Sequence, residues 1–155
     1  SAAPPTDLHE GIEVTLRLLR PKWADRITIH PNFGPIPPIH AVPGQMNQVF
    51  MNLLANACEA IPDHGNIWVT TRHADGQVHV TIRDDGTGIR PEDLHHIFDP
   101  FFSTNPHGEG TGLGLAISHG IVKDHGGTFE VTSEPGRGTE ITVRLPVNPS
   151  GDQSS

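Results

Sequence analysis

The segment QMNQVFMNLLANACEAI, residues 45–61, carries the clearest helical pattern in the chain. Its apolar residues recur at the i, i+3 and i+4 spacing of one helix face, namely Phe50, Leu53, Leu54, Ala57 and Ile61. Asn52, Asn56 and Glu59 fall within about 60° of one another on the other side, because each helical residue turns by ~100°. The segment therefore predicts an amphipathic helix with one polar stripe, which Pro62 ends.

Further helices and short strands are predicted on both sides of this segment. One helix begins at Thr6 or Asp7 and ends near Pro21, a short one begins at Pro91, and another spans residues 113–125. The expected strands are residues 27–30, 66–72, 78–83, 128–133 and 139–145, with a turn and a short edge segment in the proline-rich stretch 31–43.

These elements predict an α+β fold. It is a two-layer α/β sandwich, with a mixed, mostly antiparallel sheet packed on three helices. We expect residues 6–146 to form one domain, residues 1–5 to be an interdomain linker or a cloning remnant, and residues 147–155 to be a disordered tail. Residues 99–111 have neither period nor apolar core positions, so they predict a long loop of the kind that serves as a lid.

Composition narrows the classes of partner and compartment. The 155 residues carry a formal net charge of −8, which argues against nucleic acid or an anionic membrane as the main partner. The single cysteine excludes an internal disulfide and favours a cytoplasmic, reducing compartment. The eleven histidines show no metal-ligand spacing, and no apolar run reaches the ~20 residues of a membrane span.

The polar stripe and a glycine-containing turn are the first two candidate site segments. Amide and carboxylate oxygens on Asn52, Asn56 and Glu59 suit Mg²⁺, although a solvated helix face is the alternative. The sequence Asp-Asp-Gly-Thr-Gly-Ile, residues 84–89, follows a predicted strand. Its glycines allow a flat ligand close to the backbone, and its first carboxylate can accept a hydrogen bond from an amine; ordinary turn chemistry is the alternative.

Two more candidate segments flank the predicted loop. Gly-Glu-Gly-Thr-Gly-Leu-Gly-Leu, residues 108–115, runs into a helix, so its N–H groups and the helix N-terminus suit a polyphosphate. It neither follows a strand nor contains Gly-Lys-Ser/Thr, which disfavours a dinucleotide-binding fingerprint and a P-loop. Phe-Asp-Pro-Phe-Phe, residues 98–102, predicts an anchor for the loop, a small satellite cluster under it, or both.

In their order and spacing, the four segments resemble the N, G1, F and G2 boxes of sensor histidine kinases. The ATP-binding domain of these kinases shares the Bergerat fold with gyrase, MutL and the heat-shock chaperone. The resemblance covers residues 6–146. It implies ATP and Mg²⁺ as ligands, with residues 99–111 as the ATP lid.

The resemblance also implies roles for individual residues. Asn56 would bind Mg²⁺, Asn52 would lie beside the phosphates, Asp84 would accept the adenine amino group, and Thr139 would support the adenine through water. Asn52, Asn56 and Glu59 would form the catalytic set. The remaining nucleotide-binding positions would be Gly86, Gly88, Ile89, Phe98, Phe102, Gly110, Thr111, Gly112, Leu113, Gly114 and Leu115.

Asn52 separates kinases from ATPases within this resemblance. Gyrase-like ATPases have a glutamate there that activates water, whereas a neutral amide cannot act as a general base. The resemblance therefore implies a histidine kinase that phosphorylates a histidine on a separate dimerisation domain, from which a response regulator takes the phosphoryl group. The alternative is a nucleotide-sensing module without phosphotransfer.

Two departures from the family pattern carry consequences. Asn105 and Glu109 stand where relatives often have lysine. Either γ-phosphate contact is weaker, or Arg90, Lys123 or the partner domain supplies the charge; the alternative is that Mg²⁺ and the amides at the helix end suffice. His9-Glu10-Gly11 matches only the first two residues of the phosphoacceptor motif. We therefore expect a monomeric catalytic fragment that makes no membrane contact itself, binds ATP and does not phosphorylate its own histidines, although the full-length protein can be membrane-anchored.

Overall fold

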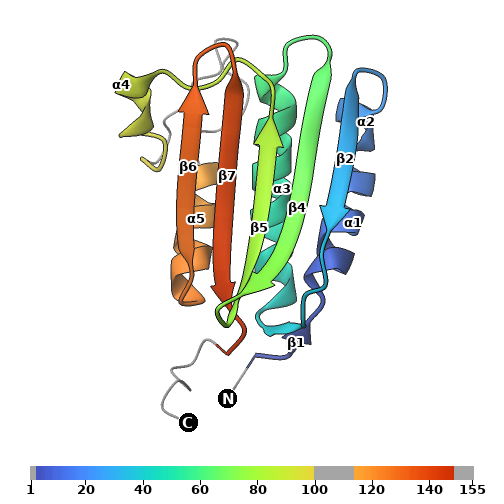
Figure 1. Cartoon of the computed structure of the whole chain (residues 1–155), viewed down its shortest axis with the longest axis vertical. Helices are drawn as coiled ribbons and strands as arrows, with labels where there is room; N and C mark the ends of the chain where they lie inside the picture. The colour runs from blue at the N-terminus through green and yellow to red at the C-terminus, as the bar shows by residue number, and fades with distance from the viewer. Residues whose placement is uncertain (1–2, 100–113, 149–155) are drawn as a thin grey trace.

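Five strands form the main sheet of the computed structural model, which describes residues 3–99 and 114–148. They lie in the order β2-β4-β5-β7-β6 (Figure 1). Their bounds are β2 (Ile27–Phe33), β4 (Gly65–Ala74), β5 (Gln77–Asp84), β6 (Thr128–Glu134) and β7 (Gly138–Pro146). β2 runs parallel to β4, and every other neighbouring pair is antiparallel. The predicted mixed, mostly antiparallel sheet is confirmed.

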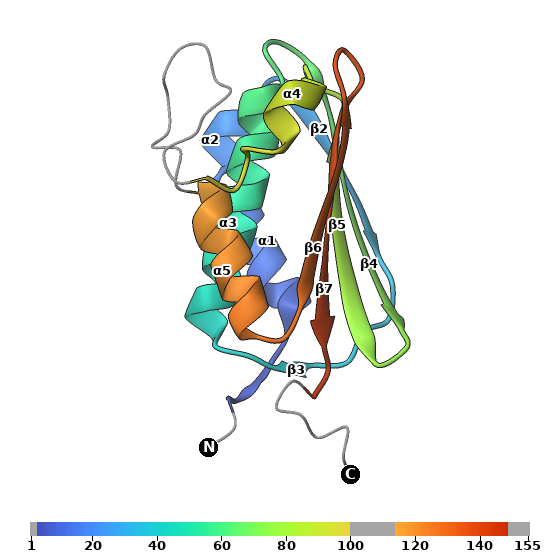
Figure 2. The ribbon, with the colours of Figure 1, turned by 90° about the vertical axis from the view of Figure 1, so that its left-hand side faces the viewer.

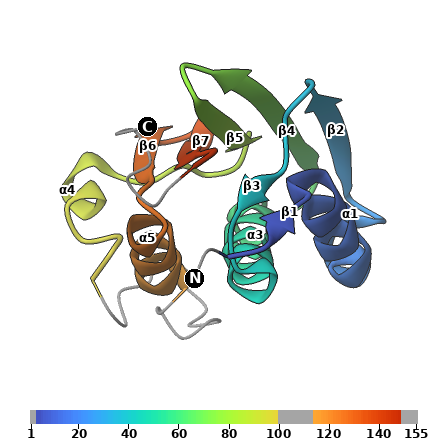
Figure 3. The same ribbon diagram turned by 90° about the horizontal axis from the view of Figure 1, so that it is seen from below.

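Three longer helices cover one face of this sheet (Figures 2 and 3). They are α1 (Leu8–Leu18), α3 (Pro43–Ala60) and α5 (Gly114–Asp124), with α3 between the other two. The Asp7 carboxylate caps α1 by accepting from the backbone N–H groups of its first turn. α3 starts two residues before the predicted helix, because Pro43 suits the first helical turn.

The hydrophobic core lies between the two layers. α3 supplies a run of fully or nearly fully buried side chains, namely Met46, Val49, Phe50, Leu53, Leu54, Ala57 and Cys58. Alternate residues of the three central strands meet them, including Ile67, Val69, Val80, Ile82, Ile141 and Val143. Burial raises the pKa of the Cys58 thiol, although nearby positive charges oppose this effect.

Two predicted elements differ from the observed ones. β2 continues through Pro31 to Phe33. Proline has no backbone N–H to donate, and this is tolerated in β2 because β2 lies at the edge of the sheet and has a neighbouring strand on one side only. The predicted first helix is divided, since α1 ends at Leu18 and a short helix, α2 (Arg20–Trp23), begins with Pro21 in its first turn.

The two ends of the domain needed correction. Pro5 is not linker, because β1 (Pro5–Thr6) pairs with β3 (Ile39–His40), the short edge segment expected in the proline-rich stretch. Val147 does not belong to a disordered tail, because it packs against the core and its N–H donates to the Gly76 carbonyl at 3.0 Å. Residues 149–155 lie outside the described residues.

Within the described residues, no helix has the length and apolar character needed to cross a membrane.

Candidate functional site

Asp84 ends β5 and is the buried carboxylate of the site. Its side chain is only 5% exposed, and its Oδ1 accepts a hydrogen bond from the Gly86 N–H at 2.9 Å. Burial raises the pKa of Asp84 to about 6, while backbone hydrogen bonds from Gly86 and Thr139 act to lower it. The site therefore contains an acceptor that is ionised at neutral pH and largely hidden from water.

Glycines allow neighbouring segments to approach Asp84 closely. A Cβ atom on Gly86 would overlap the carbonyl oxygen of Ala60 at the end of α3, and one on Gly138 would overlap the carbonyl of Asp84 itself. Gly138 also has a φ of 111°, which other residues rarely adopt. The N–H of Thr87 donates to the Ala60 carbonyl at 2.9 Å, so the turn after β5 is attached to the end of α3.

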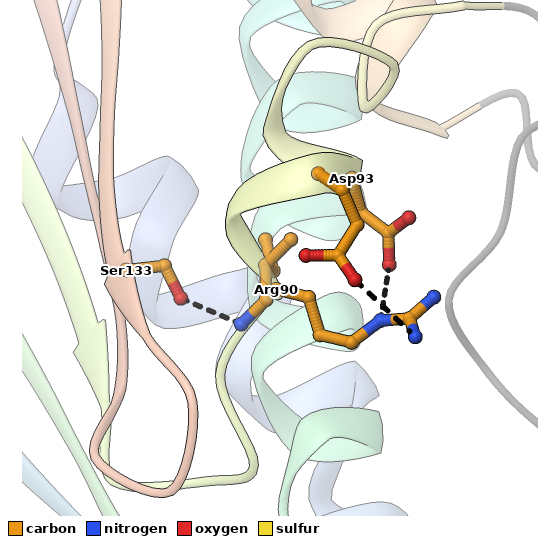
Figure 4. A network of polar contacts seen from close by, with 5 residues as sticks. Arg90, Asp93 and Ser133 are labelled. Atoms are coloured by element: carbon orange, nitrogen blue, oxygen red, sulfur yellow. Dashed lines mark hydrogen bonds and ion pairs between the residues drawn. The ribbon is translucent and has the colours of Figure 1, made fainter.

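A serine on β6 holds the other side of this turn, and the sequence did not indicate it. The Ser133 hydroxyl accepts from the N–H of Ile89 at 2.7 Å (Figure 4) and donates to the Gly138 carbonyl at 2.9 Å. Because Ser133 has only one proton to give, Thr139 is the donor in their 2.8 Å hydroxyl contact. The Thr139 oxygen therefore keeps its own acceptor capacity.

Asn52 connects α3 to the beginning of α5. Its Nδ2 donates to the Gly114 carbonyl and to the Ser118 hydroxyl, both at 3.0 Å, and Ser118 is fully buried. Its Oδ1 accepts from Gln48 at 2.9 Å. The polar stripe of α3 thus meets the helix that directly follows the glycine-rich segment.

Asn56 lies one turn beyond Asn52 and one turn before Ala60. It is half-buried, and within residues 3–99 and 114–148 its side chain has no hydrogen-bond partner. Glu59, the third predicted member, is exposed. Mg²⁺ usually binds one or two protein oxygens together with substrate phosphates, and the Asn56 amide fits that pattern. The described residues hold no cluster of three His, Cys, Asp or Glu side chains suited to a metal ion.

Phe98 belongs to a small aromatic cluster, the satellite cluster that was one of the two alternatives. Its ring stacks on His119 of α5, with the centroids 4.4 Å apart, and meets Phe129 of β6 edge-on at 5.1 Å. Phe98 thus fixes the chain to both layers just before the residues predicted to form a loop. The remaining predicted positions of this region, Phe102, Gly110, Thr111, Gly112 and Leu113, lie outside the described residues.

Two of the three proposed sources of positive charge, Arg90 and Lys123, are poorly placed. Arg90 precedes the short helix α4 (Pro91–Leu94) and pairs with Asp93 at 3.1 Å and Glu92 at 3.5 Å (Figure 4). These carboxylates raise the pKa of Arg90. Lys123 lies in the last turn of α5, nine residues or about 14 Å along the axis from Gly114.

His9 has a packing role in the fold. Its Nε2 lies 2.7 Å from the hydroxyl of Thr71, and its ring stacks on Phe33 with centroids 4.6 Å apart. This arrangement holds the first turn of α1 on the sheet, which agrees with the expectation that His9 is not a phosphoacceptor.

Comparison with known proteins gives consistent matches. A family model described as histidine kinase-, DNA gyrase B- and HSP90-like ATPase matches residues 41–149. Sensor histidine kinase ZraS of Escherichia coli K12 is 46% identical over 113 residues, which are 73% of this chain and 24% of ZraS. The chain thus spans about a quarter of that relative's length.

Solved structures share the whole fold. The mycobacterial sensor histidine kinase MprB aligns with a TM-score of 0.84 and 31% identity, covering 95% of this chain and 99% of that chain. Full-length ShkA in complex with AMPPNP aligns with a TM-score of 0.82 and 30% identity, covering 94% of this chain and 31% of ShkA. The chain therefore belongs to the histidine kinase-, DNA gyrase B- and HSP90-like ATPase family, as a catalytic domain of the sensor histidine kinase type.

Proposed function

We propose that this domain binds Mg²⁺-ATP and provides the γ-phosphoryl group for a histidine on a separate dimerisation domain. One observation carries the proposal: α3 joins a buried strand-end carboxylate to the N-terminus of a second helix. Asp84 and its turn meet Ala60 at one end of the site, and Asn52 meets Gly114 at the other. About 12 Å of helix separates Asn52 from Ala60.

The residues between Asp84 and the N-terminus of α5 each suit one part of the nucleotide. The Asp84 carboxylate accepts a hydrogen bond from the adenine amino group, and the Thr139 oxygen is free to accept from a bridging water. Glycine N–H groups between residues 110 and 114, together with the N-terminus of α5, bind the phosphates. Asn56 holds the Mg²⁺, which when bound neutralises phosphate charge during transfer.

Asn52 favours phosphotransfer over hydrolysis. An amide has no proton-accepting capacity comparable to a carboxylate, and both ends of the Asn52 amide already bind Gln48, Gly114 and Ser118. The domain can therefore keep ATP until an acceptor side chain arrives. ShkA, described in complex with AMPPNP, supports this class of ligand.

The partners follow from the relatives. ZraS is a sensor histidine kinase about four times as long as the matched region. We propose that this chain works with a dimerisation domain that carries the acceptor histidine, and that a response regulator takes the phosphoryl group from that histidine. The single, buried Cys58 suits a reducing, cytoplasmic setting.

Titration with Mg²⁺-AMPPNP and transfer in trans test the proposal. We expect the isolated domain to bind the nucleotide and to produce acid-labile phosphohistidine only when the dimerisation domain of a close relative is added. The matched control is Asn56→Ala, which keeps the apolar face of α3 and should lose Mg²⁺-dependent binding. Absence of nucleotide binding, steady phosphate release without acceptor, or labelling of the domain alone would contradict the proposal.

Replacing Asn105 by lysine tests the source of charge at the γ-phosphate. Arg90 is already paired and Lys123 lies at the far end of α5, so we propose that Mg²⁺ and the helix N-terminus supply most of this charge. Asn105→Lys should then change the ratio of ATP to ADP affinity little. A large gain in ATP affinity would show instead that the lid lacks a needed cation.

A further inference from the structure

Asp85, the residue next to the adenine-binding carboxylate, is bound to the first strand of the central hairpin. Its Oδ1 accepts from the backbone N–H of Asn66 at 2.8 Å, and its Oδ2 accepts from the Asn66 side chain at 2.9 Å. Its own N–H donates to the Asn66 carbonyl at 3.3 Å. Because the β4–β5 ladder ends at the Ile67–Asp84 pair, these bonds extend the sheet by one residue pair. A Cβ on Gly65 would come within 2.6 Å of the Asp85 carboxylate, which explains the glycine there.

His30 on β2 contacts the Asn66 side chain of this pair. Since the Asn66 amide nitrogen donates to Asp85, its oxygen accepts, and His30 Nε2 donates to that oxygen at 2.8 Å. The His30 ring stacks on Trp68 with centroids 5.2 Å apart, and the Arg83 guanidinium lies 4.6 Å from the Trp68 ring. Three neighbouring strands thus hold Asn66 in one orientation.

The Asn66–Asp85 pair fixes the backbone beside Asp84 on the side of β4, opposite the side of β7. Thr139 of β7 is opposite Asp84 on one side, and Asn66 holds the following residue on the other. Burial acts to raise the pKa of Asp85, but hydrogen bonds from Asn66 hold it below its ordinary value, so Asp85 stays ionised and bonded to Asn66. The two adjacent carboxylates therefore have separate tasks.

We propose that the Asn66–Asp85 pair, backed by His30, is a positioning element that fixes the Asp84 carboxylate for the selection of adenine over guanine. The inference rests on the proposed function, since it assumes an adenine nucleotide at Asp84. Adenine presents an amino donor where guanine presents a carbonyl acceptor. A rigid carboxylate rejects that acceptor, whereas a carboxylate that can turn aside tolerates it.

A charge-swap series tests this role. Asn66→Asp puts a second carboxylate against Asp85, and the double variant Asn66→Asp/Asp85→Asn restores one carboxylate and one amide. We expect Asn66→Asp to weaken ADP binding about tenfold, a typical coupling for residues in direct contact, and to lower the preference for ADP over GDP by a similar factor. The double variant should recover both. Saturating ATP should restore the phosphotransfer rate of Asn66→Asp, so KM changes and kcat does not.

Asp75→Asn is the control for a change of one unit of charge in the same hairpin, because it lies at the opposite end, in a turn where Asn accepts the positive φ of 56°. It should leave both affinities unchanged. An unaltered ADP-to-GDP preference in Asn66→Asp, or a folded double variant that does not recover it, would overturn the inference. If Asn66→Asp unfolds, Asn66→Ala takes its place, because it removes the side-chain bond to Asp85 without adding charge and should likewise weaken ADP binding and lower the ADP-to-GDP preference. A wild-type domain that binds no adenine nucleotide would instead refute the proposed function.

Discussion

At the scale of single residues, Asp84 is held in a form that costs stability. A carboxylate that is 5% exposed and has a pKa near 6 is ionised at neutral pH against the preference of its surroundings. In the unfolded chain the same carboxyl has a pKa of 3.8, so on raising the pH the unfolded state loses its proton first. Deprotonation therefore stabilises the unfolded state relative to the folded state. The domain therefore gives up folding free energy to keep an acceptor in the site.

Asp84→Asn should separate stability from binding. Because the folded pKa is raised, the wild-type cost develops as the pH rises from about 4 to 6 and stays constant above that range. We expect the variant to be more stable than the wild type by about 1 to 3 kcal/mol at pH 7.5, with a smaller difference at pH 4.5. Urea unfolding at both pH values measures this difference.

Nucleotide titration of the same variant provides the functional half of the test. Affinity for adenine nucleotides should fall in Asp84→Asn, and wild-type affinity should fall as the pH drops through about 6, where Asp84 takes up a proton. A stability difference that does not change with pH would show that Asp84 is not the titrating group.

Two glycine substitutions should have opposite effects on folding. A methyl group on Gly86 would overlap the Ala60 carbonyl, so Gly86→Ala should destabilise the domain by about 2 to 4 kcal/mol. Gly120 in α5 has open space around its Cβ position, and Gly120→Ala should stabilise by up to about 1 kcal/mol through helix propensity. Thermal unfolding distinguishes them. Equal changes in stability for the two variants would mean that the backbone at Gly86 can move away from the Ala60 carbonyl at little cost.

At the scale of elements, α3 serves the core and the site with opposite faces. Its apolar residues are buried under the sheet, and Asn52 of its polar stripe reaches α5. The backbone carbonyl of Ala60, at its C-terminal end, binds the turn after β5. Arg26, just before β2, donates to the carbonyls of Ile61 and Cys58 and so completes the C-terminus of this helix. The position of α3 therefore fixes the distance between the two ends of the site.

Asn52→Ala should loosen the contact between α3 and α5. The change removes two hydrogen bonds to α5 and leaves the buried Ser118 without the Asn52 donor. We expect a loss of about 1 to 3 kcal/mol in the free energy of unfolding, together with weaker nucleotide binding. Gln48→Ala is the control, since Gln48 contacts only the acceptor side of Asn52, and it should cost less than about 0.5 kcal/mol. Equal losses would contradict a specific link between the helices.

Sequence patterns predict the helices and strands whose apolar residues recur at a regular spacing. The α3 segment and the β4–β5 hairpin have clear apolar spacing, and both were placed to within two residues. β2 was predicted too short, because the tolerance of Pro31 depends on its position at the sheet edge, which the local sequence does not state. The division of the first helix at Leu18 was missed for a similar reason, since Pro21 either ends a helix or begins one.

The sequence could propose candidate site residues that lie in a recognisable motif, but not residues that reach the candidate site only through the fold. Asp84 and Asn52 lie in short, dense motifs. Ser133 and Asn66 both contact the motif that contains Asp84, from 44 and 19 residues away, through hydrogen bonds to Ile89 and Asp85. The spacing of nearby residues in the sequence does not predict such a contact, because the contact forms only when the strands pair in register.

At the scale of the whole molecule, ligand binding should stabilise both layers together. The site joins β5, β6 and β7 to α3, and Asn52 extends it to α5. Mg²⁺-ADP at one hundred times its Kd should therefore raise the free energy of unfolding by about 2.7 kcal/mol. Scanning calorimetry with and without EDTA measures the Mg²⁺-dependent part. An unchanged melting temperature at saturating nucleotide would contradict binding to the folded state.

The pairing of β1 with β3 also decides where the molecule can be held. Residues 40 and 41 hydrogen-bond to Val147 on one side and Pro4 on the other, so both ends of the described chain meet at one pole. Figures 1 and 2 show this pole opposite the turn that follows β5. A sensor chip, fluorescent tag or neighbouring domain attached at either end thus leaves the turn after β5, and with it the proposed adenine site at Asp84, facing away from its anchor.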